Sequence, residues 1–227
     1  MKRMYLGLCL FFLAASVYAT QVETVFEPLA ARYRESRGDG HGRPHVREWF
    51  FVREANRVEL GRGPYVELWE RDERGEVSWQ RIFHDERKLI AYTPGELRTQ
   101  QRAPAWGVLN TLIDERLLTT LTPVGPARHL GRKATRYRGR VGEEWVEVVW
   151  LDAERLPAQV ARRDAHHVYR LRLMELLPAP RSTWPRANPE RAAEYEQIDG
   201  ADLGDREYDP FVRKILAVDA VHGGHAH

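Results

Sequence analysis

The residues with the clearest capacity for metal chemistry lie near the C-terminus. His222, His225 and His227 end the chain, and neutral imidazoles at this spacing can bind copper, nickel or zinc. Five acidic residues also crowd the segment 199–209, where carboxylates could bind calcium, although their spacing does not match an EF-hand loop. Two interpretations therefore remain open, a metal site or a solvated acidic loop followed by a disordered tail.

Nucleophilic catalysis has little support in the sequence. Ser36, Ser78 and Ser182 are the only serines after residue 20, and none lies in a Gly-x-Ser-x-Gly turn. Cys9 is the only cysteine of the chain and falls within an N-terminal apolar run. We therefore expect a binding protein rather than an enzyme, with no cofactor unless the histidines bind copper or zinc.

The N-terminus has the pattern of a secretory signal peptide. Lys2 and Arg3 precede the apolar run 5–15, and Val17-Tyr18-Ala19 provides the small or modest residues that a signal peptidase reads. The run is short against the roughly 20 residues that span a bilayer. We expect residues 1–19 to be removed by cleavage after Ala19 and the mature protein to work in the periplasm.

The charge of the mature chain argues against a polyanionic partner. Without Lys2 and Arg3, the 35 basic residues become 33, which equals the number of acidic residues. Phosphate binding needs a basic excess or a basic stripe, and this chain interleaves its charges. We therefore expect no nucleic-acid binding. We also expect the protein to be a monomer.

Short strands joined by polar turns make up most of the chain between residues 48 and 177. The first group is predicted at 48–53, 57–60, 65–70, 77–84 and 88–92, and a second group runs from 131 to 177. The turns between them are too short for crossover helices, so the sheet should be antiparallel.

Two helices are expected beside the sheet. The pattern Val25, Phe26, Leu29, Ala30 and Tyr33 predicts an N-terminal helix within 22–35. A second helix is predicted over 104–118, where apolar residues recur at intervals of three and four positions and form one stripe. This stripe must cover something apolar, and the sheet is the only candidate.

The strand at 145–151 is apolar on both faces. Val146, Val148 and Trp150 alternate with Trp145, Val149 and Leu151, and Glu147 is the only charge among them. Such a sheet needs either helices packed on one face or a curved shape whose concave side encloses a cavity. After residue 178 the composition shifts to proline, alanine and charge, which predicts an irregular C-terminal extension over 179–227.

A pair of strand sequences then suggests a family. The strand Glu147-Val-Val-Trp-Leu-Asp152 is followed by Leu156-Pro-Ala-Gln-Val160, and this order of elements resembles the LolA/LolB-like outer-membrane lipoprotein-sorting carriers. The resemblance covers roughly 49–177. It implies an α+β fold over 20–178, an incomplete β-barrel of curved antiparallel sheet closed by a helical lid, whose concave face holds acyl chains.

The resemblance implies a carrier for an acyl chain, a lipoprotein or a similar apolar ligand. The cavity and lid residues would be Trp69, Trp106, Leu109, Leu112, Ile113, Trp145 and Val149. That family locks its lid with an arginine, but several arginines of this chain are equally placed. Two alternatives remain, a metal-handling accessory protein that uses the histidine tail and an envelope-stress sensor domain that binds a partner protein.

Overall fold

The first half of the chain forms a meander of six strands. A computed structural model describes residues 26–39 and 42–223. The strands are β1 (Leu29–Gly38), β2 (His45–Glu54), β3 (Arg57–Gly61), β4 (Val66–Arg71), β5 (Val77–Phe83) and β6 (Lys88–Tyr92). The strands predicted between residues 48 and 92 are thus confirmed as β2 to β6.

Short helices separate this meander from a second one. The helices are α1 (Pro94–Thr99), α2 (Trp106–Thr111) and α3 (Arg116–Thr120). The second meander is β7 (Thr122–His129), β8 (Arg132–Val141), β9 (Glu144–Leu151), β10 (Leu156–Arg163) and β11 (Val168–Leu177). The chain continues through α4 (Pro189–Ala192), β12 (Glu196–Asp199), the 3-10 turn η1 (Ala201–Leu203) and α5 (Pro210–Gly223). No helix in the described ranges is long and apolar enough to cross a membrane.

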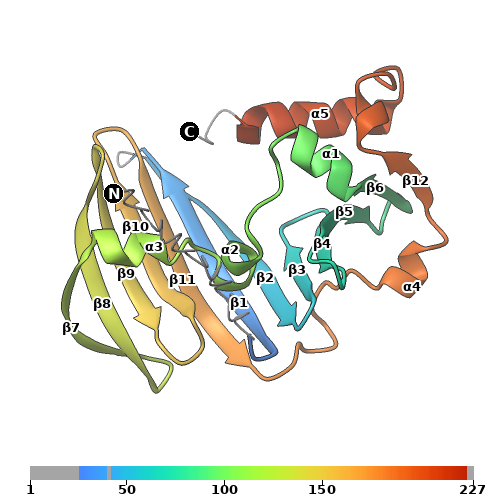
Figure 1. Cartoon of the computed structure of the whole chain (residues 1–227). Coiled ribbons are helices and arrows are strands. Elements are labelled where there is room, and N and C mark those ends of the chain that lie inside the picture. Colours follow the sequence, from blue (N-terminus) through green and yellow to red (C-terminus); the bar gives the residue numbers. More distant parts are fainter. Residues whose placement is uncertain (1–25, 40–41, 224–227) are drawn as a thin grey trace, which may run out of the picture.

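The two meanders join into one open, curved sheet of twelve strands (Figure 1). Strand β11 pairs with β1, so the end of the second meander lies against the start of the first. The order runs from β12 and β6 at one edge through β1 and β11 to β8 and β7 at the other. All neighbours are antiparallel except β12 and β6, which pair in parallel and correct the prediction of a purely antiparallel sheet.

The predicted N-terminal helix is wrong where the structure describes it. Residues 29–38 form β1, which pairs with β2 on one side and β11 on the other. Ala30 and Ala31 are both fully buried, which an interior strand covered on its two faces explains better than a one-sided helix. The apolar spacing fitted both periods, and pairing with two neighbours decided in favour of the strand.

The C-terminal segment is also more ordered than its composition suggested. Its residues from 189 onward supply α4, β12 and α5. Phe211, Val212 and Ile215 of α5 are buried in the main cluster, which is the largest group of buried apolar side chains and includes Tyr33, Phe51, Trp79 and Leu151. The segment predicted to be an irregular extension therefore completes the edge of the sheet and part of its core.

Both faces of β9 are apolar and covered, as the alternation predicted. Val149 and Leu151 belong to the main cluster. Val146, Val148 and Trp150 form with Leu121 a second group, the β9 cluster. From Val148 to Leu151 the strand is therefore enclosed on each side by packed side chains.

A close backbone approach in the C-terminal segment gives a stability test. A Cβ atom on Gly200 would lie 2.2 Å from the ring of Tyr92, whereas one on Gly204 would meet nothing within 4 Å. We predict that Gly200→Ala lowers the free energy of unfolding by about 1–3 kcal/mol, as overpacked sites do. Urea denaturation should show this loss, and Gly204→Ala should leave stability near that of the parent. Equal stability of the two variants would mean that β12 and η1 do not pack on Tyr92.

Candidate functional site

Residues 104–120 form two short helices, α2 and α3, rather than the single helix predicted over 104–118. Helix α2 ends at Leu112, whose φ of 64° places it in the left-handed region. The Asp114 carboxylate then accepts a hydrogen bond from the Arg116 amide at 2.9 Å and starts α3. Aspartate competes with the helix for backbone donors in this way, so the break follows from local chemistry that the apolar spacing did not reveal.

The apolar stripe of this segment covers the sheet, as predicted. Leu109 is buried in the main cluster, and the half-buried Leu112 packs against the same cluster. Ile113 contacts both the main cluster and the β9 cluster, and Leu117 and Leu118 of α3 contact the β9 cluster. One apolar surface thus runs from α2 to α3 and spans both clusters.

A buried arginine holds α2 against the sheet. Arg53, near the end of β2, is 2% exposed and donates to three backbone carbonyls. Its Nη1 bonds the Asn110 oxygen of α2 at 2.9 Å, its Nη2 the Glu154 oxygen at 2.7 Å and its Nε the Glu27 oxygen at 2.9 Å. Burial lowers the pKa of Arg53 to about 10, so the group stays charged at neutral pH.

A second arginine holds α3. Arg155, in the turn between β9 and β10, donates to both carboxylate oxygens of Glu115, and the bond from its Nε is 2.8 Å long. Its guanidinium also lies 4.8 Å from the ring centre of Phe26, and that of Arg53 lies 5.3 Å from the same ring centre. The two arginines and Phe26 therefore tie α2, α3 and the chain ahead of β1 to one point of the sheet.

The residues predicted to line a cavity are only partly brought together. Leu109 and Val149 are buried in the main cluster, and Trp106, Leu112 and Ile113 are half-buried against it. Trp69 belongs to the same cluster and stacks on Trp79 with ring centres 4.9 Å apart. Trp145 is not part of this arrangement, because it is 46% exposed, and the guanidinium of Arg140 lies 5.8 Å from its ring centre.

The histidines of the metal hypothesis fall at the margin of the structure. His225 and His227 lie outside the described residues, and His222 lies in the last part of α5. Within 26–39 and 42–223, no three His, Cys, Asp or Glu side chains are grouped so that they could hold a metal ion.

The acidic run has structural partners. The Asp209 carboxylate accepts from the Phe211 amide at 2.8 Å and pairs with Lys88 at 3.2 Å. The hydrogen bond from the Phe211 amide is the main reason that the pKa of Asp209 is lowered. Asp199 likewise accepts from the Ala201 amide at 3.0 Å. Asp209 therefore caps the start of α5, and Asp199 caps the turn after β12.

A polar and aromatic pocket of about 510 Å³ lies between β4, β5 and α5, and the sequence patterns did not reveal it. It is lined by Tyr65, Glu67, Trp69, Trp79, Arg81, Gln101, Arg102, Ala103, Pro104 and Asp219. Arg81 is 1% exposed and donates to both oxygens of Asp219, at 2.8 and 2.9 Å. Burial opposes the charge on Arg81, but the bonds and charge of Asp219 outweigh it, so the pKa of Arg81 is raised.

One sequence signal was available for both buried arginines. Arg53 continues the alternation Trp49, Phe51 along β2, and Arg81 lies between Trp79 and Phe83 along β5. Each is therefore a charge on the apolar side of its strand, where an unpaired charge is costly and a partner must exist.

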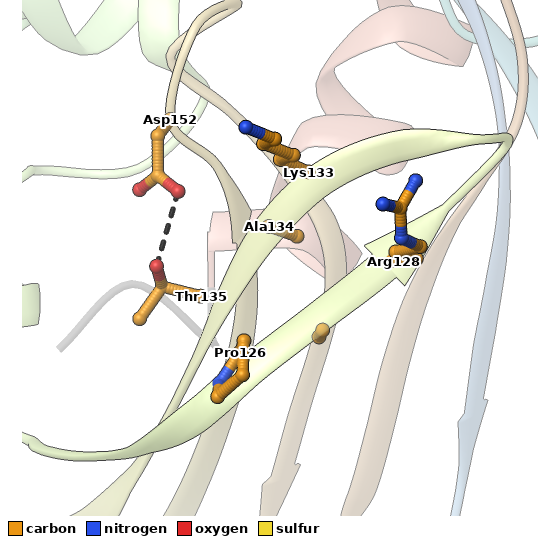
Figure 2. Close-up of a pocket in the computed structure, with 7 residues that line it drawn as sticks. Pro126, Arg128, Lys133, Ala134, Thr135 and Asp152 are labelled. Carbon is orange, nitrogen blue, oxygen red and sulfur yellow. Dashed lines mark hydrogen bonds between the residues drawn. The ribbon is translucent and has the colours of Figure 1, made fainter.

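A second hollow, of about 560 Å³, opens on the hairpin of β7 and β8 (Figure 2). Its lining includes exposed Arg128 and Lys133, and the Thr135 hydroxyl donates to Asp152 at 3.0 Å. Strand β7 was not predicted, because Pro123 and Pro126 cannot donate to a ladder. It is an edge strand, where proline is tolerated.

Comparison with known proteins gives fold likenesses of low sequence identity. No family model matches the chain, and no curated protein matches it. Solved structures similar to it include PNGF-II (TM-score 0.42, 11% identity, 79% of this chain and 32% of that one). They also include the MucA/MucB complex of Pseudomonas aeruginosa (TM-score 0.36, 12% identity, 71% of this chain and 54% of that one).

A LolA superfamily protein of Nitrosomonas europaea is similar as well, with a TM-score of 0.33 and 8% identity over 68% of this chain and 87% of that one. The chain spans about a third of the length of PNGF-II and about half that of the matched MucA/MucB chain. A putative outer membrane lipoprotein-sorting protein domain from Vibrio parahaemolyticus is similar too, with a TM-score of 0.30 and 8% identity over 71% of this chain and 88% of that one.

Proposed function

We propose that this protein is a non-enzymatic periplasmic binding protein for an acyl chain or a similar apolar ligand, with the α2–α3 segment as its lid. The observation that carries the proposal is the fixation of this segment by Arg53. The guanidinium holds α2 through a backbone carbonyl, at Asn110, and not through a side-chain carboxylate. Such a bond positions the helix without adding a second buried charge, and water can replace it when the helix moves away.

The apolar surface under the segment is the proposed site of ligand contact. When α2 and α3 lift, the β9 cluster and the adjoining part of the main cluster become accessible, because Leu109, Ile113 and Leu117 now cover them. An acyl chain that takes the place of these side chains buries the same surface, at about 25 cal/mol per Å² of apolar area. Closed and open states can then differ little in free energy, which reversible binding requires.

Leu112 is the proposed hinge. A leucine in the left-handed region costs roughly 1–2 kcal/mol relative to a helical one, so the closed state holds some backbone strain at the junction of α2 and α3. Release of this strain favours movement of the two helices relative to one another.

Native mass spectrometry of the mature protein tests the proposal directly. We predict that protein purified from the periplasm carries an apolar mass that mild organic extraction removes, and that the extracted protein takes up a palmitoyl amide with a fluorescent NBD group. A protein that is bare as purified and fails to bind this probe would contradict the proposal. Uptake of copper or zinc that is lost on deletion of residues 221–227 would favour the metal-handling alternative, and co-purification of an envelope protein would favour the sensor alternative.

Removal of the Arg53 guanidinium should loosen the lid. In Arg53→Met three carbonyls lose their donor, and each buried carbonyl left without a partner costs about 1–3 kcal/mol unless it reaches water. We predict that the segment opens to let water in, so the NBD probe binds about tenfold faster than to the parent in stopped-flow measurements. Arg34→Met is the matched control, since Arg34 is exposed and pairs with Glu48 at 3.1 Å. Equal association rates in all three proteins would show that Arg53 does not restrain the lid.

A charge placed on the underside of the lid should weaken both fold and binding. Ile113 contacts both apolar clusters, so Ile113→Asp buries a carboxylate against them or forces the segment off the sheet. We predict a loss of about 2–4 kcal/mol in urea denaturation and weaker NBD probe binding. Thr119→Asp, on the exposed side of α3, provides the control. Parent-like stability and binding in Ile113→Asp would exclude the segment as a lid.

A further inference from the structure

A second site is built around Arg81 of β5, which is separated from β2 and Arg53 by strands β3 and β4. Arg81 projects from β5 on the same side as Trp79 and Phe83, and its guanidinium lies 4.7 Å from the ring centre of Tyr65. It is almost completely buried, at 1% exposure. A cation in such surroundings requires an anionic partner, and a planar guanidinium fits the two oxygens of a carboxylate best.

The partner in the structure comes from the last helix. Asp219 binds the two Nη groups of Arg81 through its two oxygens, at 2.8 and 2.9 Å, and its own side chain is 37% exposed. The first part of helix α5 is anchored, because Phe211, Val212 and Ile215 are buried in the main cluster and Leu216 packs against it. The carboxylate of Asp219 is thus the partly exposed member of the pair, and it lies beyond the part of α5 that the main cluster anchors.

Two side chains that line the pocket carry a buried donor without a hydrogen-bond partner among the described residues. Trp79 lines it and is 7% exposed, and its Nε1 has no hydrogen-bond partner among the described residues. The Nε of Arg81 also lacks a hydrogen-bond partner among the residues that the structure describes. Buried donors normally find acceptors, so two unpartnered donors beside one pocket indicate room for acceptor atoms of a ligand.

The charges around the pocket define the ligand further. The pocket lining contains two positive side chains, Arg81 and Arg102, and two negative ones, Asp219 and Glu67. The Glu67 carboxylate accepts a hydrogen bond from Trp69 at 3.2 Å. When Asp219 withdraws, one positive charge is left in excess, which suits a single negative charge better than a phosphate dianion. The rings of Tyr65 and Trp79 provide apolar surface beside the arginine, and the volume of about 510 Å³ is that of a small-molecule site.

We propose that Arg81 anchors a second binding site, for a small monocarboxylate with an apolar or aromatic body, and that Asp219 of α5 occupies this site in the ligand-free protein. The ligand carboxylate replaces that of Asp219 on the two Nη groups, and the body of the ligand lies against Tyr65 and Trp79. Binding thereby releases the end of α5. Loss of the pair between Arg81 and Asp219 would then accompany occupation of the site. The site is separate from the acyl site and does not depend on it.

Isothermal titration calorimetry with N-acetyl-L-phenylalanine tests the proposal, with its neutral amide as the matched probe. We predict that Asp219→Ala binds the acid at least about tenfold more tightly than the parent does, because the internal competitor is gone, and that the amide binds weakly to both. Asp205→Ala removes the same charge from an exposed turn and should behave as the parent. Arg81→Lys in the Asp219→Ala background should lose the gain, because lysine cannot form the two parallel bonds.

Hydrogen exchange of the parent protein provides a second test, which does not depend on whether any variant folds. An excess of the acid should speed the exchange of amides in α5 beyond Leu216, and the amide probe should not. Equal binding of the acid and the amide by Asp219→Ala would overturn the proposal. So would an α5 whose exchange is the same with and without an excess of the acid.

Discussion

The arrangement of the molecule depends on the burial of one guanidinium. Arg53 collects carbonyls from the chain ahead of β1, from α2 and from the turn between β9 and β10, which are segments far apart in the sequence. A buried charge of this kind must be fully hydrogen-bonded, so its presence fixes all three segments at once. It thereby decides where the α2–α3 segment lies, and this segment separates the apolar side chains of two clusters from solvent. The proposed carrier function is a consequence of that placement.

A buried arginine on the apolar side of a strand occurs twice, with different hydrogen-bond partners. Arg53 is satisfied by backbone carbonyls, whereas Arg81 is satisfied by a carboxylate from the last helix. Each arginine lies on the apolar side of its strand, Arg53 after Phe51 and Arg81 between Trp79 and Phe83, and each contacts a helix beside the sheet. The difference in partner predicts a difference in ligand: displacement of a carbonyl exposes an apolar surface, and displacement of a carboxylate leaves a site for another anion. Two restraints at separate places allow each helix to move without the other.

Local patterns in the sequence predicted much of the sheet, but not the central strand β1 or the edge strands β7 and β12. Strands β2 to β6, the two apolar faces of β9 and the stripe from Leu109 to Leu117 follow from periodicity and turn residues. The spacing of Leu29, Ala30 and Tyr33 fits a helix as well as a strand, and only the pairing of β1 with its two neighbouring strands decides between them. The parallel pairing of β12 with β6 depends on contacts between distant parts of the chain, which no local pattern carries. Neither site arginine was singled out, although a charge on an apolar face gave a signal for both.

The most direct measurement is hydrogen exchange of the parent protein, followed by mass spectrometry, with and without the NBD-labelled palmitoyl amide. If α2 and α3 form a lid, amides in 106–120 exchange through local opening well before those of β1, β2 and β11, and the probe alters exchange in 106–120 while the central strands stay unchanged. Protection of α2 and α3 as strong as that of the central strands, with no response to the probe, would contradict a lid and leave the segment as fixed packing on a closed core.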